Sequence, residues 1–173
     1  MHQEKVKKRD GSGSLGILWF TIFLDLLGFG IIIPILPVVA KEYAVQANWG
    51  IEPDIMVGIV VMAFSLMQLL FSPAVGNLSD RIGRRPVLLT TILLTASGSL
   101  LFGIAGGLSM LILSRLVSGL GSANIPTAQA YIADITSPED RASKMGLIGA
   151  AFGLGFVFGP AIGAALVYIA SIY

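Results

Sequence analysis

The chain has no cysteine, a single histidine and few charged residues. Without cysteine it can form no disulfide, thiol nucleophile or thiolate metal site, and His2 stands alone near the N-terminus. Only 12% of residues are charged, against about 25% in soluble domains, and a net charge of +1 offers no basic surface for nucleic acid. The sequence also lacks a phosphate-binding loop and a nucleophile elbow, so it predicts no enzyme, no cofactor and no metal site.

Long apolar runs dominate the sequence instead. Hydrophobic residues make up 55% of the chain, and the mean hydropathy is +0.85. Because a membrane-spanning helix needs about 20 mostly apolar residues, residues 15–173 are expected to form an all-α integral membrane region of five transmembrane helices. Their expected spans are about 15–39, 55–76, 86–105, 108–132 and 144–170. Residues 1–14 are basic and then rich in glycine and serine, which indicates a cytoplasmic tail and not a cleaved signal peptide.

The basic residues predict the orientation of these spans, because short loops rich in lysine and arginine stay in the cytoplasm. With the N-terminus inside, only Lys41 falls on the outer side, while Arg115 lies within a span. The residues placed inside are Lys5, Lys7, Lys8, Arg9, Arg81, Arg84, Arg85, Arg141 and Lys144. We therefore expect a multi-pass protein of the inner or plasma membrane with a cytoplasmic N-terminus.

An internal repeat supports this division. The hexapeptide FSPAVG at 71–76 recurs as FGPAIG at 158–163. In the expected topology the second span runs inward and the fifth outward, so the copies are inverted, as in many transporters. The alternative is chance similarity between apolar helices. A completed second repeat would need a sixth span.

The stretch GNLSDRIGRRPV places an acid and three arginines between two apolar runs. Asp80 ends the second span, where the helix dipole is already negative, so it needs a cation as partner. Gly76 and Gly83 permit close approach and a tight turn. A basic inside loop is the plain alternative, and it explains the arginines but not the acid between glycines.

This stretch resembles the loop between the second and third helices of the major facilitator superfamily, G-x-L-x-D-R-x-G-R-R/K-P, at every fixed position. In that family the loop latches the two six-helix halves on the cytoplasmic side. The resemblance therefore implies a conformational gate formed by Gly76, Asp80, Arg81, Gly83, Arg84, Arg85 and Arg141. Arg141 lies in SPEDRASKMG, which resembles the family's connection between helices four and five, and is a candidate partner for Asp80. Arg81 is the nearer alternative in sequence.

Two charges lie inside the expected spans, Asp25 and Arg115. Either residue at mid-helix is unfavourable by about 2.5 to 3.5 kcal/mol, which makes both functional candidates. Their expected depths differ by only about 5 Å at a rise of 1.5 Å per residue, so a direct or water-linked pair is expected. The functional interpretation is that Asp25 gains and loses a proton, and the alternative is a purely structural ion pair.

Both charges sit in motifs that resemble proton-coupled exporters. RLVSGLG from Arg115 to Gly121 is similar to the fourth-helix motif R-x-x-Q-G-x-G of drug exporters, with Ser118 in place of glutamine. Asp25 with Gly28, Pro34 and Pro37 resembles the first-helix pattern D-x-x-G-x-G-x-x-x-P-x-x-P of tetracycline-type exporters. The resemblance implies that Asp25 and Arg115 take part in proton coupling.

The fifth span contains GFVFGPAIGA, which resembles the antiporter motif G-x-x-x-G-P-x-x-G-G, with Ala164 at the last position. Its matching residues are Gly155, Gly159, Pro160 and Gly163. In the family this motif separates exporters from importers, whereas ordinary close packing of small residues is the alternative. Three polar residues within spans, Gln68, Asn124 and Gln129, are candidates to line a substrate cavity, or else to bond neighbouring helices.

Together these motifs resemble the N-terminal half, without its sixth helix, of a proton-coupled multidrug or tetracycline-type exporter. The implied function is export of small amphipathic compounds in exchange for protons by alternating access. The implied partners are a small-molecule substrate, protons, the lipid bilayer, and the missing C-terminal half or another chain. The alternatives are an importer or uniporter of a small metabolite, and a truncated fragment without transport of its own.

Overall fold

The computed structural model describes residues 12–170, which fold into α-helices without a β-strand. The helices are α1 (Ser12–Ala47), α2 (Pro53–Ile82), α3 (Arg84–Gly103), α4 (Leu108–Gly121), α5 (Ile125–Ile135) and α6 (Pro138–Ala170). With α4 and α5 taken together, five helical segments are long and apolar enough to cross a membrane. The prediction of an all-α, five-span membrane fold is confirmed.

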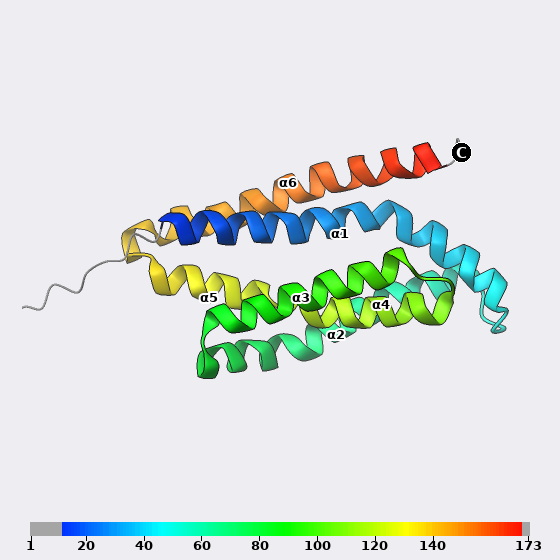
Figure 1. Ribbon diagram of the computed structural model, residues 1–173, viewed down its shortest axis with the longest axis horizontal. Helices are drawn as coiled ribbons and strands as arrows, with labels where there is room; N and C mark the ends of the chain where they lie inside the picture. The colour runs from blue at the N-terminus through cyan, green and yellow to red at the C-terminus, as the bar shows by residue number, and fades with distance from the viewer. Residues whose placement is uncertain (1–11, 171–173) are drawn as a thin grey trace, which may run out of the picture.

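The helices run beyond the apolar runs that predicted them. α1 continues to Ala47 and α2 to Ile82, so that Gly83 alone separates α2 from α3. Hydropathy reports only the apolar part of a helix, and polar turns at its ends escape it. α1 also passes through Pro34 and Pro37 and bends in its C-terminal part (Figure 1), because each proline removes one backbone hydrogen bond from the helix.

The fourth expected span is interrupted at residues 122–124. Pro126 has no N–H to donate to the carbonyl of Ser122 four residues earlier, and here the helix is interrupted, although α1 continues through Pro34 and Pro37. The side-chain amide of Gln68 on α2 donates to the Ser122 carbonyl instead, at 3.1 Å. The break thus lies beside a proline, and a second helix supplies the missing donor.

Glycines set the packing of the long helices. α6 lies along α1 (Figure 1) with its stripe of Gly155, Gly159 and Gly163 against the α1 backbone. α4 packs between α2 and α3, with Gly119 against the backbone of Phe64 and Gly121 against that of Thr95. Small residues allow such close approach between membrane helices.

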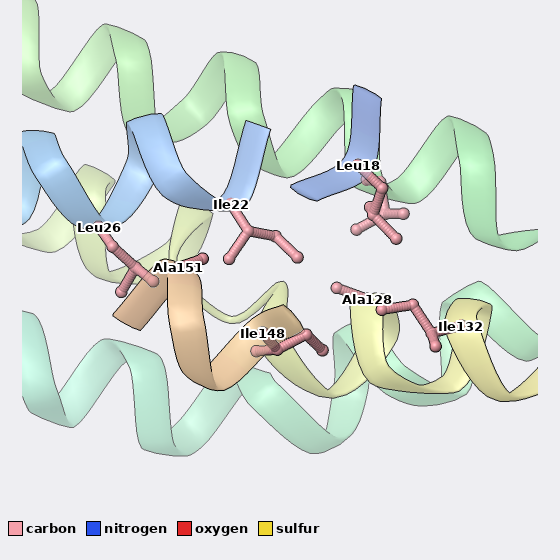
Figure 2. Close-up of a cluster of buried hydrophobic side chains, with 8 residues drawn as sticks. Leu18, Ile22, Leu26, Ala128, Ile132, Ile148 and Ala151 are labelled. Atoms are coloured by element: carbon pink, nitrogen blue, oxygen red, sulfur yellow. The ribbon is translucent and has the colours of Figure 1, made fainter. Parts of the chain in front are cut away.

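Two apolar clusters form the core, one toward each end of the bundle. The first joins α1, α3, α5 and α6 (Figure 2) and contains Leu18, Ile22, Leu26, Leu88, Ala128, Ile132, Ile148 and Ala151. The second joins α1, α2 and α4 and contains Leu36, Ala40, Ala44, Met56, Val60, Leu108 and Leu111. Asp25 lies on α1 between Ile22 and Leu26 of the first cluster, and Arg115 lies on α4 one turn after Leu111 of the second.

Candidate functional site: a polar layer and an arginine cluster

Asp25 is bound by an amide and not by an arginine. The side-chain N–H of Asn124 donates to Asp25 Oδ2 at 3.4 Å, from the break between α4 and α5. Asn124 is only 6% exposed. Within residues 12–170 no ion pair joins Asp25 to Arg115, so the direct form of the expected pair is wrong. The break turns Asn124 toward α1, which a continuous helix prediction cannot anticipate.

Arg115 is buried, and no carboxylate within residues 12–170 pairs with it. Its side chain is 2% exposed, and its Nε donates to Ser114 Oγ at 3.4 Å. The guanidinium carbon stands 4.6 Å from the centre of the Phe102 ring, a cation–π arrangement. Its Nη2 has no hydrogen-bond partner among the described residues. A buried charge left this incompletely bonded is energetically unfavourable, which supports a functional role.

A small cavity joins the two charges. Asp25 and Arg115 both line it, and its volume of about 20 Å³ has room for roughly one water molecule. Hydroxyl-bearing residues complete the polar part of its wall: Thr95, Ser99, Ser118 and Ser122. The Oγ of Ser118 is buried and also finds no hydrogen-bond partner in the part of the chain that the structure describes. The water-linked form of the pair therefore stays a prediction. We call Asp25, Arg115, Ser118 and Asn124 the polar layer.

Two of the three residues expected to line a substrate cavity make hydrogen bonds within the bundle, and the cavity itself stays a prediction. Gln68 bonds the Ser122 carbonyl, Asn124 bonds Asp25, and Gln129 is exposed on α5. Gln68 thus makes a hydrogen bond to a neighbouring helix segment, as its alternative interpretation expected.

The second group lies where α2 meets α3. Gly83 has φ = +100°, a conformation that disfavours any side chain, and it reverses the chain in a single residue. Arg84 then reaches three partners: Asp80 Oδ1 at 2.5 Å, Ser79 Oγ at 2.8 Å and Asp134 Oδ2 at 3.0 Å. Arg84 thus ties α2 and α3 to the end of α5. We call Ser79, Asp80, Arg84 and Asp134 the arginine cluster.

The expected partner of Asp80 is corrected by this arrangement. Asp80 pairs with Arg84, four residues later, and not with Arg141 or Arg81. Arg141 instead donates to the carbonyl of Ala133 at 3.1 Å, near the end of α5, where a cation satisfies terminal carbonyls. Asp134 was not among the residues singled out from the sequence. In the sequence, the only indication of a role for Asp134 was its position at the end of an amphipathic segment.

The remaining motif residues are placed as follows. Arg81 and Arg85 are exposed, and a methyl group at Gly76 would meet nothing within 4 Å. Gly155 packs on Leu26, next to Asp25, and Pro160 lies against Gly30 of α1. The glycines of the antiporter-like motif are therefore packed onto the helix that carries Asp25.

Comparison with known proteins adds independent findings. The Major Facilitator Superfamily model matches residues 18–173. The tetracycline resistance protein, class E, of Escherichia coli is 40% identical over 142 residues, covering 82% of this chain and 34% of that protein. The class C protein of Escherichia coli is 37% identical over 155 residues, covering 90% and 38%.

The quinolone resistance protein NorA of Staphylococcus aureus is 33% identical over 148 residues, covering 85% of this chain and 36% of NorA. The chain spans about one third of the length of these relatives. The family comprises transporters and not enzymes, which agrees with the sequence prediction. The chain is therefore a multi-pass membrane protein that belongs to the Major Facilitator Superfamily of transporters.

Proposed function

We propose that this chain is the N-terminal part of an exporter that moves small amphipathic compounds out of the cell in exchange for protons. The observation that carries the proposal is the polar layer. A carboxyl group and an uncompensated guanidinium line one small cavity. Buried charges of this kind in membrane proteins mark ion and proton pathways. The resistance proteins among the relatives favour a drug-like substrate.

In this proposal Asp25 is the group that gains and loses the proton. When charged, it attracts Arg115 across the cavity and accepts the hydrogen bond of Asn124. When neutral, both interactions weaken, because hydrogen bonds to ionised groups are about twice as strong as neutral ones. Protonation thereby changes how α1 is held against α4 and α5, which biases the equilibrium between inward- and outward-facing states.

The arginine cluster has the role of the gate. It holds the ends of α2, α3 and α5 together, and we place it on the cytoplasmic side together with the N-terminus. A complete gate needs a second set of helices to close against, so transport requires the rest of a full-length transporter or another chain. Binding sites between repeats of such proteins follow the same logic.

The test is ethidium flux in proteoliposomes under an imposed pH gradient, using the longest product of the reading frame that contains this chain. Gradient-driven flux should be lost in Asp25→Asn and retained in Asp54→Asn, which alters an exposed ion pair with Lys41. Flux opposite to the proton movement supports export. Flux in the same direction as protons would favour the importer, and flux that survives Asp25→Asn would overturn the coupling role.

A further inference from the structure

α5 carries a functional contact at each end. Asn124 immediately precedes it and bonds Asp25, while Asp134 in its last turn bonds Arg84. The two residues are ten positions apart, about 15 Å along a helix. A single short helix therefore connects the polar layer to the arginine cluster.

The helical hydrogen bonds of α5 are also not continuous with those of α4. The last helical bond of α4 is Ser122 N–H to the Ser118 carbonyl, and the first of α5 is Ala128 N–H to the Asn124 carbonyl. Between them Pro126 leaves a gap in the backbone hydrogen bonds. One face of α5 is buried through Thr127, Ala128 and Ile132. A helix with such a break at its start can shift as a unit, because few bonds must change.

We propose that Asn124 is a positioning residue that couples the charge of Asp25 to the Arg84–Asp134 ion pair through α5. The inference rests on the proposed function, in which Asp25 changes its protonation state. A charged Asp25 holds Asn124, and with it the start of α5, more strongly than a neutral one. Release at that end lets α5 shift, and Asp134 moves relative to Arg84.

The surroundings of Asp25 assign this role to Asn124 and not to Arg115. Arg115 is the only other charged residue lining the shared cavity, where α3 presents Thr95 and Ser99 and α2 presents Phe64. Arg115 lies on α4, before the break, so its attraction to Asp25 does not pull on α5 directly. Only Asn124 joins Asp25 to α5 by a side-chain hydrogen bond among the described residues.

Hydrogen–deuterium exchange of the 173-residue chain in lipid nanodiscs tests this coupling. The readout is the exchange rate of amides at 131–136 and 80–85, around the arginine cluster. Asp25→Asn and Asn124→Ala should each raise these rates by about tenfold, the scale of one hydrogen bond to a charged group. The double variant should add nothing beyond Asn124→Ala, because both changes act on the same bond, which Asp25→Asn weakens and Asn124→Ala removes. Gln129→Ala, exposed on α5, is the matched control and should leave the rates unchanged.

Unchanged rates at the arginine cluster in Asp25→Asn, or fully additive effects in the double variant, would overturn the coupling. Asn124→Ser is a second variant that keeps a short donor, and intermediate rates there exclude simple misfolding. The readout does not depend on transport. Coupled exchange without Asp25-dependent flux would overturn the proposed function alone, whereas Asp25-dependent flux with additive exchange effects would overturn only the role of Asn124.

Discussion

The α1–α6 and α2–α4 pairs solve the same packing problem differently. In α1–α6, Gly30 meets the carbonyl of Gly155 and Gly159 meets Gly30, so glycine faces glycine. In α2–α4, Gly119 meets the carbonyl of Phe64 and the Cβ of Met67, so one glycine faces a stretch of helix that has no glycine. The internal repeat predicts that these pairs are related, because each joins the first helix of one repeat to the second helix of the other.

Neither contact has room to adjust. The nearest atom to Gly30, Gly119 and Gly159 is a backbone atom, and the Cβ of Met67 moves only with its backbone, so no rotamer change relieves the crowding. The repeated hexapeptides show a clearer difference in the space around a glycine. Gly163 in FGPAIG packs against the Ile31 carbonyl and Pro34, but its counterpart Gly76 in FSPAVG has open space around it.

Among the substitutions that test this comparison, Gly163→Ala is expected to have the largest effect on stability. The added methyl group would overlap the backbone of Ile31 and lie 2.8 Å from Pro34 Cγ, which should lower the free energy of unfolding by about 1–3 kcal/mol. Thermal unfolding in detergent measures this. Gly76→Ala, the repeat-related control, should leave stability unchanged or raise it slightly. Equal losses in both variants would contradict the packing difference.

A second substitution probes the α2–α4 pair. Gly119→Ala should cost about 1–2 kcal/mol, because the new methyl group crowds Phe64 and approaches Met67 Cβ to 3.0 Å. Adding Met67→Ala should recover none of that loss, because alanine keeps the Cβ and the contact with the Phe64 carbonyl remains. A double-mutant cycle in the same unfolding assay measures this, and recovery of stability in the double variant would contradict it.

The arginine cluster fastens α2 and α3 to α5, and its loss should have a smaller effect. Arg84→Gln should reduce stability by up to about 1 kcal/mol, since its partners Asp80 and Asp134 are more than half exposed and solvent screens the pairs. The reduction should shrink in about 1 M salt. Arg141→Gln, which removes one bond to a carbonyl, serves for comparison and should show little salt dependence.

Topology can be tested without changing stability at all. The chain has no cysteine, so Glu52→Cys and Asp140→Cys each introduce a single exposed thiol. A membrane-impermeant maleimide should label position 52 in intact cells and position 140 only after permeabilisation. The opposite pattern would reverse the proposed orientation, although the inverted relation of the two helix pairs would stand.

The five spans and the positions of Asp25 and Arg115 were predictable, because hydropathy and isolated charge are properties of the sequence alone. The break before α5 was not predicted, although Pro126 offered a signal that the apolar run around it concealed. Asn124 was expected to line a substrate cavity, and its bond to Asp25 emerged only from the fold, while Asp134 became a candidate only when the fold brought it to Arg84. Arg141 was assigned the wrong partner, because sequence motifs do not rank competing arginines by geometry.

Gly83 has a consequence for how motion passes through the bundle. Only one residue, Gly83, connects α2 to α3, so the two helix ends cannot move apart. A tilt of α2 at this end must therefore appear as a tilt of α3, whereas a longer connection would absorb it. The single-residue connection therefore transmits a tilt from one helix to the other, and lengthening it by a few flexible residues would weaken this coupling and separate Arg84 from Asp80.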